Sequence, residues 1–296
     1  MSGNQQLVAR GTSWNYLGYN IPTIEAHIAK RTFANSVPYL ASVLESLPPD
    51  FTFLDVGCGP ASITIDIARR YPLATILAIE GSPNVISHAR DAAREADVHN
   101  IRFALGDALN LAPTASEPGF ERVKGGCDLA HTHNVLMHTT NPSRGLAELR
   151  FAVKVGGFVC CKEADRGCLT LWPESVQIRR TYEVISGIVK AKGGDPYVGR
   201  KLKAYAIAAG FELNDVRVGQ IPWVISSRDE REQWGGLVAR TSASPAARAQ
   251  VEREAKEIGQ SIDLQDLHKH WRVWIEDSTA FASISDFYVV CEKTTP

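Results

Sequence analysis

A glycine-rich turn that follows a short apolar run constrains this 296-residue chain more than any other feature. In the segment from Leu54 to Ser62, apolar residues break into Gly57-Cys58-Gly59 and then into a helix-forming stretch. Glycine tolerates positive φ and lets a ligand approach the backbone closely. A strand, a glycine turn and a helix in this order therefore predict a cofactor of nucleoside or amino-acid type bound at the turn.

Two carboxylates stand at the ends of the next two apolar runs, at Glu80 and Asp107. In an open parallel α/β sheet the carboxyl ends of the strands face one crevice, where ligands bind. Glu80 follows Gly59 by 21 positions, close to the offset of roughly 20 residues at which an acid meets a ribose hydroxyl in dinucleotide folds. The spacing predicts a bound nucleoside.

A nicotinamide dinucleotide fits this pattern less well, because its fingerprint needs glycine or alanine where the chain has Ser62. Over residues 51–165 the sequence resembles the class I S-adenosylmethionine-dependent methyltransferases, and within them the ubiquinone/menaquinone-type small-molecule branch. Cys127 to His138 resembles the fourth strand and its exit, and Val155 to Glu163 resembles a glycine turn into a fifth strand. Val155 departs from the branch, which commonly has proline there.

The resemblance implies S-adenosyl-L-methionine as cofactor, with Glu80 clamping the ribose and Asp107 contacting the adenine. Tyr16 and Tyr19 in the N-terminal arm either reach the cofactor's carboxylate or anchor the arm on the core. No carboxylate cluster has metal-ligand spacing near the strand ends, so we expect no metal. The expected cofactor-binding residues are Tyr19, Asp55, Gly57, Cys58, Gly59, Glu80, Gly81, Ser82, Gly106, Asp107, Ala108 and His133.

Histidines at the exit of the fourth strand are the candidate catalytic residues. A sulfonium methyl is already an activated electrophile, and holding the acceptor in line with it can supply roughly 7 to 11 kcal/mol. A hydroxyl acceptor also benefits from a base, for which His133 and His138 are the candidates. Backbone contact for His133 and packing for His138 are the alternatives. His131 shares a strand face with His133, so we expect it to be buried beneath the site.

The pattern of elements and the resemblance together predict an α/β fold. We expect a Rossmann-like, seven-stranded, mostly parallel sheet with helices on both faces, an N-terminal helical arm and an inserted helical lid. The expected units are residues 1–50 (arm), 51–168 (cofactor-binding core), 169–199 (helical insertion), 200–220 (core helix and strand), 221–284 (lid) and 285–296 (final strand). Helices are expected over 22–32, 37–47, 62–70, 142–153, 176–192, 200–209, 245–258 and 264–275, and the last two strands over 211–218 and 286–292.

Composition limits the classes of molecule that the chain is expected to bind. A formal charge of −1 and a pI near 6.7 give no basic surface field, which disfavours nucleic acid. No run reaches the roughly 20 apolar residues of a membrane span, and no leader pattern opens the chain, so we expect a cytoplasmic protein. The six cysteines fall mostly in strand-like runs and are expected to be reduced thiols. A homodimer through the arm or the lid helices stays open.

These features predict in-line methyl transfer to a hydroxyl or carbon of a small organic molecule, such as a natural-product or quinone-like intermediate. Two alternatives stay open because a fold does not fix its chemistry. One is a methyltransferase-like cyclase or pericyclase that uses the cofactor as a scaffold, and the other is a non-catalytic cofactor-binding regulator. Tryptophans of the insertion and lid either stack on a flat acceptor or form the core of the lid: Trp172, Trp223, Trp234, Trp271 and Trp274.

Overall fold

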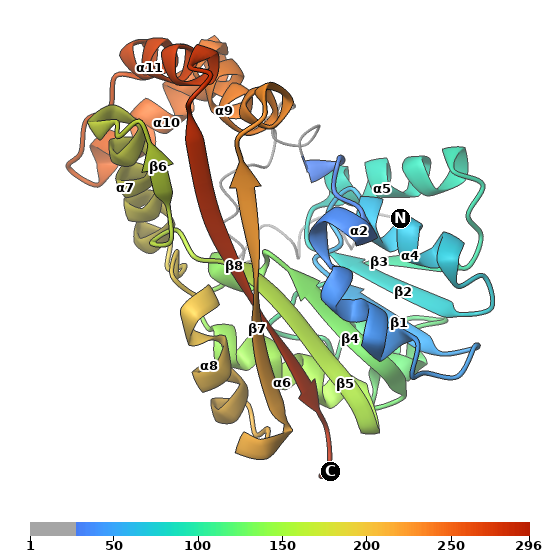
Figure 1. Ribbon diagram of the computed structural model, residues 1–296. Helices are drawn as coiled ribbons and strands as arrows, with labels where there is room; N and C mark the ends of the chain where they lie inside the picture. The colour runs from blue at the N-terminus through green and yellow to red at the C-terminus, as the bar shows by residue number, and fades with distance from the viewer. Residues whose placement is uncertain (1–27) are drawn as a thin grey trace, which may run out of the picture.

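The computed structural model describes residues 28–296, which build one mixed sheet flanked by helices (Figure 1). The strands run in the order β3-β2-β1-β4-β5-β8-β6, and β7 pairs with β8. Neighbours among β1 to β5 are parallel, whereas β8 is antiparallel to β5, β6 and β7. The strands are β1 (Thr52–Val56), β2 (Thr75–Glu80), β3 (Ile101–Leu105), β4 (Cys127–His133), β5 (Val153–Ala164), β6 (Thr170–Trp172), β7 (Val216–Ile225) and β8 (Phe281–Glu292).

The Rossmann-like α/β sheet is confirmed, but the expected number of seven strands is wrong, because the described residues form eight. The additional strand, β6, pairs with β8 through Leu171 and Ala282, and Ile225 of β7 pairs with Ala282 from the other side. The β5 pairing with β8 ends at Ala164 and Asp286, so β6 follows β5 along the same edge of β8. A three-residue strand is too short to show an alternating pattern in the sequence.

Helices cover both faces of the sheet, as expected. On one face Val37, Ile63 and Ile67 pack against Phe53 and Cys160. On the other face the helical residues Leu146, Leu149 and Leu202 pack against neighbouring strand positions such as Leu54 and Cys161. The helices concerned are α2 (Phe33–Ser36), α3 (Ala41–Leu44), α4 (Ser62–Arg70), α5 (Pro83–Glu95), α6 (Pro142–Ala152) and α8 (Leu202–Ala208).

Two expected elements differ from those observed, and the helix expected over 22–32 lies mostly outside the described residues. The helix expected over 37–47 is a 3₁₀ turn at Pro38–Leu40 followed by the four-residue α3. The strand expected over 211–218 begins only at Val216, after a 3₁₀ turn at Leu213–Asp215, and continues to Ile225. Phe211 is buried and Leu213 is exposed, although a strand would place them on the same face. The start of β7 is set by its pairing with β8. The local alternation of apolar and polar residues does not reveal such a long-range contact.

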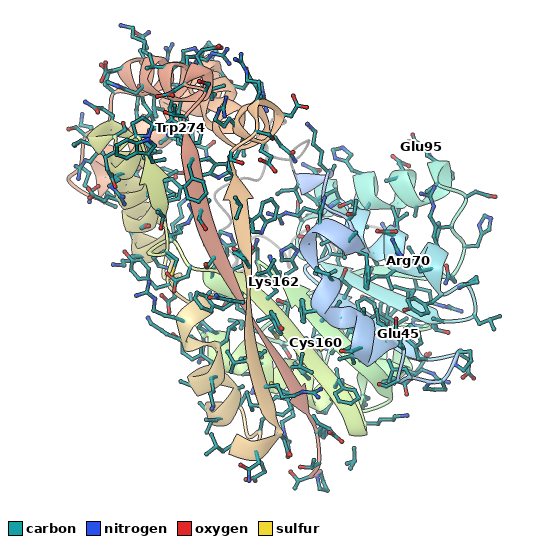
Figure 2. All side chains as sticks on the ribbon, viewed as in Figure 1. Glu45, Arg70, Glu95, Cys160, Lys162 and Trp274 are labelled. Carbon is teal, nitrogen blue, oxygen red and sulfur yellow. The ribbon has the colours of Figure 1, made fainter. Side chains whose placement is uncertain are left out.

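Four helices gather at the far end of the β7–β8 ribbon, next to β6 (Figure 1). We call α7 (Val176–Ala191), α9 (Arg228–Ala243), α10 (Pro245–Glu257) and α11 (Leu264–Glu276) the distal helices. Their centre is aromatic: the ring centroids of Trp234, Trp271 and Trp274 lie 5.0 to 5.8 Å apart in edge-to-face geometry. Trp271 and Trp274, the latter labelled in Figure 2, are buried, so these two residues form the core of the cluster.

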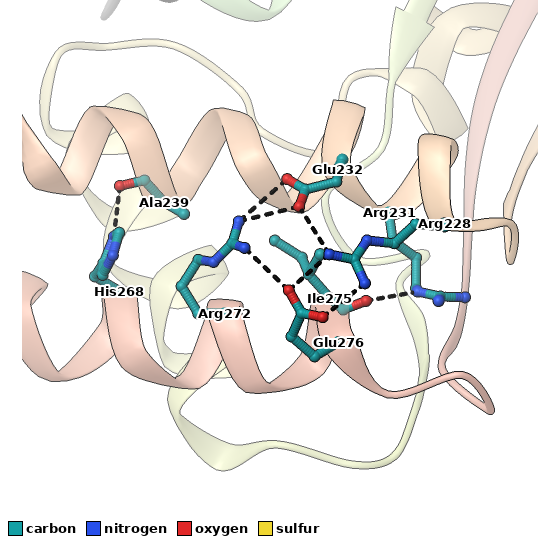
Figure 3. Close-up of polar contacts among 8 residues, drawn as sticks. All are labelled: Arg228, Arg231, Glu232, Ala239, His268, Arg272, Ile275 and Glu276. Carbon is teal, nitrogen blue, oxygen red and sulfur yellow. Dashed lines mark hydrogen bonds and ion pairs between the residues drawn. The ribbon is translucent and has the colours of Figure 1, made fainter.

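Polar contacts tie α9 to α11 along the surface of the distal helices (Figure 3). Arg272 of α11 contacts Glu232 of α9 at 3.1 Å and Glu276 on its own helix at 3.0 Å. The buried Arg231 donates from Nε to the carbonyl of Ile275 at 2.9 Å. A capping box begins α9, because Ser227 and Glu230 exchange side chain to backbone hydrogen bonds.

Candidate active site

The glycine turn closes tightly between β1 and α4. Gly57 and Gly59 have φ values of +76° and +56°, in the region that favours glycine. The amides of Gly57 and Cys58 donate to the carbonyl of Ile79 at 2.7 and 3.1 Å. A Cβ on Gly57 would lie 2.4 Å from Cγ2 of Val135, so the packing at the end of β4 also requires glycine. Burial raises the pKa of the Cys58 thiol, which therefore stays protonated.

Glu80 joins the ends of β1 and β2. One carboxylate oxygen accepts the amide of Gly59 at 3.0 Å, and the other accepts the amides of Gly81 and Ser82 at 2.8 and 3.0 Å. The side chain is buried. Four of the residues expected to bind the cofactor are thus brought together through one carboxylate.

The end of β3 closes the same edge of the sheet. The amide of Gly106 donates to the carbonyl of Glu80 at 3.1 Å. A Cβ on Gly106 would lie 2.5 Å from Oγ1 of Thr114, so this position also has no room for a side chain. Asp107 accepts the amide of Leu109 at 2.8 Å, which shapes the following turn around the buried Ala108. The expected convergence of three strand ends is therefore present.

Asp55, another residue expected to bind the cofactor, has both of its carboxylate oxygens engaged by side chains. Oδ1 lies 3.1 Å from Nδ1 of His131, and Oδ2 accepts the hydroxyl of Thr64 at 2.6 Å. Asp55 and His131 are both buried, as was expected for His131. Asp55 consequently ties β1 to β4 and α4 beneath the glycine turn.

His133 ends β4 and contacts a buried ion pair. Its Nε2 lies 3.2 Å from Nζ of Lys162, and the fully buried Lys162 pairs with Asp286 of β8. Nδ1 of His133 has no hydrogen-bond partner among residues 28–296. Burial, with the nearby Lys162 charge, holds the pKa of His133 well below its ordinary value. The imidazole is therefore neutral at physiological pH.

One buried carboxylate holds the loop after β4 in place. Glu163 of β5 accepts the amides of Val135 and Leu136 at 2.9 and 2.8 Å and that of Met137 at 3.2 Å. Burial raises the pKa of Glu163 to about 7. His138, which ends this loop, has its pKa lowered to about 3 by burial and by the charge of Arg166. Glu163 therefore positions both the loop and the second candidate histidine.

Sequence reasoning missed Lys162 and Asp286 as members of the site and placed Trp223 in the lid. Trp223 instead lies on β7, and Nζ of Lys162 stands 5.9 Å from its ring centroid. A usable signal was present for Lys162, because a lysine inside the apolar run Val155 to Glu163 is unusual. Tyr19, like Tyr16, lies outside the described residues.

The described part of the chain lacks two features, a metal-binding cluster and a membrane-spanning helix. Residues 28–296 hold no group of three or more His, Cys, Asp or Glu side chains arranged to bind a metal. Within the same range, no helix is both long and apolar enough to cross a membrane. All six cysteines are free thiols, as expected. A cavity of about 810 Å³ opens beside the glycine turn, between α4 and α5, and its lining includes Pro60, Ser62 and His88.

Known protein families and sequences resemble this chain. Residues 48–193 match the model of a methyltransferase domain. The chain carries a methyltransferase domain. Beyond the domain, the chain is 27% identical over 282 residues to an uncharacterized methyltransferase of Schizosaccharomyces pombe, covering 91% of this chain and 95% of that protein. The likeness thus extends beyond the residues that match the domain model.

Solved structures share the fold at low sequence identity. The [4+2]-cyclase SpnF superposes with a TM-score of 0.55 at 16% identity, covering 93% of each chain. Phosphoethanolamine N-methyltransferase 2 of Haemonchus contortus, in complex with S-adenosyl-L-methionine, superposes with a TM-score of 0.54 at 13% identity, covering 96% of this chain and 60% of that one. At these identities the likeness establishes the fold of the methyltransferase domain and its surroundings.

Proposed function

We propose that this protein transfers the methyl group of S-adenosyl-L-methionine to an oxygen or carbon of a small organic molecule. One observation carries the proposal: Glu80 gathers the amides of Gly59, Gly81 and Ser82 at an edge where three parallel strands end, within a methyltransferase domain. A carboxylate fixed in this way stands where a ribose binds in related folds. In support, a structure with the same fold was solved with S-adenosyl-L-methionine bound.

In this proposal the adenosyl group lies across the ends of β1, β2 and β3. Gly57, Cys58 and Gly59 offer close backbone approach, and Glu80 accepts the ribose hydroxyls. Asp107 and Ala108 border the adenine, and His133 faces the methyl group from the end of β4. The bound sulfonium supplies an activated methyl, so the protein contributes chiefly alignment and exclusion of water. Membership of the ubiquinone/menaquinone-type branch remains a finer proposal that rests on the sequence motifs.

The test is binding of the cofactor measured by isothermal titration calorimetry. We expect one S-adenosyl-L-methionine per chain and no heat with NAD. Glu80→Gln keeps the size of the side chain but removes the negative charge, so we expect at least about tenfold weaker binding, because hydrogen bonds to a charged group contribute about 1.5 to 3 kcal/mol. Wild-type affinity in this variant would contradict the placement of the ribose.

Glu95→Gln is the matched control. Glu95 lies exposed at the end of α5, away from the strand ends (Figure 2), and undergoes the same loss of charge. We expect wild-type cofactor affinity in this variant. Circular dichroism melting curves of both variants separate a loss of binding from a loss of folding.

A methyltransferase-like cyclase remains the second candidate, because SpnF, a [4+2]-cyclase, shares this fold across 93% of the chain. The two functions differ in what happens to the cofactor. Methyl transfer produces one S-adenosylhomocysteine for each product molecule, whereas a cyclase forms product while S-adenosyl-L-methionine stays intact. Mass spectrometry of the cofactor after turnover therefore separates them.

A further inference from the structure

The loop that follows β4 is hydrogen-bonded to β5 at each residue from 134 to 137. Asn134 donates its amide to the carbonyl of Lys162 at 2.9 Å, and its side-chain oxygen accepts the amide of Ala164 at 2.9 Å. Glu163 accepts the amides of the next three loop residues. β4 and β5 are neighbouring parallel strands (Figure 1). Main-chain and side-chain contacts together therefore fix the loop relative to β5.

Asn134 has a backbone conformation that needs such anchoring. Its φ is +56°, in the left-handed region that is costly for residues other than glycine, although asparagine tolerates it better than most. Residues held in sparsely populated regions persist where surrounding contacts over-determine them, and they cluster at functional sites. The contacts with β5 therefore maintain a loop conformation that the local chain does not favour.

Val135 connects this loop to the glycine turn. Its side chain is buried and lies against Gly57, because a Cβ built on Gly57 would stand 2.4 Å from Cγ2 and 3.1 Å from Cγ1 of Val135. The amide of Val135 donates to Oε1 of Glu163 at 2.9 Å. One residue thus joins the buried carboxylate to the first glycine of the turn. Contiguous packed side chains and hydrogen bonds of this kind carry energetic coupling between sites.

We propose that Glu163 is a positioning residue for the cofactor: through Val135 it holds the glycine turn in the form that binds S-adenosyl-L-methionine. The inference rests on the proposed function, which assigns the cofactor to that turn. Glu163 itself is fully buried behind the loop, so in this proposal it acts through its neighbours and makes no contact with the cofactor.

The negative charge of Glu163 is what holds the loop. The amides of Val135 and Leu136 share Oε1, and the amide of Met137 donates to Oε2. A carboxylate offers two acceptor oxygens, whereas a protonated carboxyl or a glutamine amide carries a donor in place of one of them. Hydrogen bonds to an ionised acceptor are also the stronger ones. Loss of the charge therefore weakens all three contacts and leaves at least one amide facing a donor.

This charge changes near neutral pH. Burial raises the pKa of Glu163 to about 7, although the three amides and the charge of Lys162 act to lower it. Ionisable groups near Glu163 keep one form over the same range, because burial keeps three of them neutral and two stand in ion pairs: Tyr39, Cys161 and His138, and Lys162 and Arg200. Glu163→Gln therefore reproduces the neutral form of wild type.

The test is calorimetric titration of S-adenosylhomocysteine into the full-length protein at pH 8 and pH 6. At pH 8 we expect Glu163→Gln to bind at least about fivefold more weakly than wild type, the lower end for coupled sites. At pH 6 wild type is itself mostly protonated at Glu163, so the two dissociation constants should agree to within about twofold. A role in folding stability alone would not produce this convergence.

Val135→Ala tests the route of the coupling. This variant removes the two methyl groups that lie against Gly57. In the Val135→Ala background, Glu163→Gln should weaken cofactor binding by less than about twofold at pH 8, because the contact that transmits its effect is already lost.

Asp128→Asn is the matched control. Asp128 is a buried acid at the opposite end of β4, where it accepts the amide of Thr52 at 2.7 Å. The substitution removes a buried charge that holds a backbone amide, as Glu163→Gln does, but at the amino ends of the strands. We expect wild-type cofactor affinity at both pH values, and melting curves confirm that each variant is folded.

Three results would overturn the proposal: equal affinities of wild type and Glu163→Gln at pH 8, an undiminished difference between them at pH 6, and an equal loss with and without the Val135 methyl groups. If Glu163→Gln does not fold, wild type is compared with Val135→Ala. Wild-type affinity should then fall between pH 8 and pH 6 at least about twofold more than that of Val135→Ala, and equal falls would also overturn the proposal.

Failure of this inference is distinguishable from failure of the proposed function. Binding of S-adenosylhomocysteine by wild type, with no effect of Glu163→Gln, removes the positioning role and leaves methyl transfer standing. Absence of binding by wild type at both pH values removes the proposed function itself.

Discussion

The two sides of the candidate site differ in how their polar side chains are engaged. On the side of β1 and β2, the carboxylates are engaged by the protein itself: Glu80 accepts three amides, and Asp55 contacts His131 and Thr64. On the side of β4, β5 and β7, His133 and Trp223 each retain a buried donor without an acceptor in the described chain.

This difference indicates two ways of preparing a site. A carboxylate held by backbone amides keeps its position before any ligand arrives, and this suits a cofactor that is the same in every turnover. Unpaired buried donors carry a desolvation cost of about 1 to 3 kcal/mol each, which a ligand oxygen relieves on binding. The contrast separates a side whose carboxylates are fixed by the protein from a side that keeps buried donors without an acceptor in the described chain.

The largest expected effect comes from breaking the buried Lys162–Asp286 pair between β5 and β8. Asp286→Ala leaves a buried ammonium without its carboxylate, and we expect the free energy of unfolding to fall by about 3 to 5 kcal/mol. The double variant Lys162→Met, Asp286→Leu removes both charges and should recover most of that loss. Urea denaturation followed by circular dichroism measures both. Equal losses in the single and double variants would show that the ion pair does not govern stability here.

A smaller, pH-dependent effect should come from His138. The folded protein keeps this imidazole neutral down to a pKa of about 3, whereas the unfolded chain protonates it near 6.5. The unfolded chain therefore binds more protons between these values, and stability falls as the pH falls. Between pH 6.5 and 5 we expect wild type to lose about 1 to 2 kcal/mol relative to His138→Gln. Urea midpoints at several pH values measure this difference.

Glu163 should give a pH dependence of stability opposite in sign to that from His138. Its pKa rises from 4.5 to about 7 on folding, so the folded state binds the extra proton between these values and stability falls as the pH rises. The difference between wild type and Glu163→Gln should therefore slope opposite to that for His138. Parallel slopes for the two variants would contradict the assignment of either burial effect.

The smallest effect is expected on the surface of the distal helices (Figure 3). Arg272 bridges Glu232 and Glu276, but all three side chains are at least about one-third exposed. Solvent and salt screen such pairs, so Arg272→Ala should leave the thermal midpoint unchanged within error in 0.15 M salt. A clear drop would show that these ion pairs carry more of the docking of α9 on α11 than the tryptophan core does.

Local chemistry explains which parts of the fold were predictable. The starts of α4 at Ser62 and of α6 at Pro142 were predicted to the residue, because a glycine turn and a proline in the first turn act within a few positions. The convergence of Gly59, Glu80 and Asp107 followed from the rule that parallel strands end at one edge. The start of β7 was missed because Phe211 and Leu213 mimic an alternating strand.

The sequence alone determined the glycine turn, the acids that end β2 and β3 and the starts of α4 and α6, because each depends on backbone preferences within a few residues. Tertiary structure decided the polar cluster around Lys162. Lys162 and Asp286 are 124 positions apart, and only the antiparallel pairing of β8 with β5 and β7 places them beside His133 and Trp223. Pairing over such distances depends on the packing of the whole sheet, which no local pattern encodes.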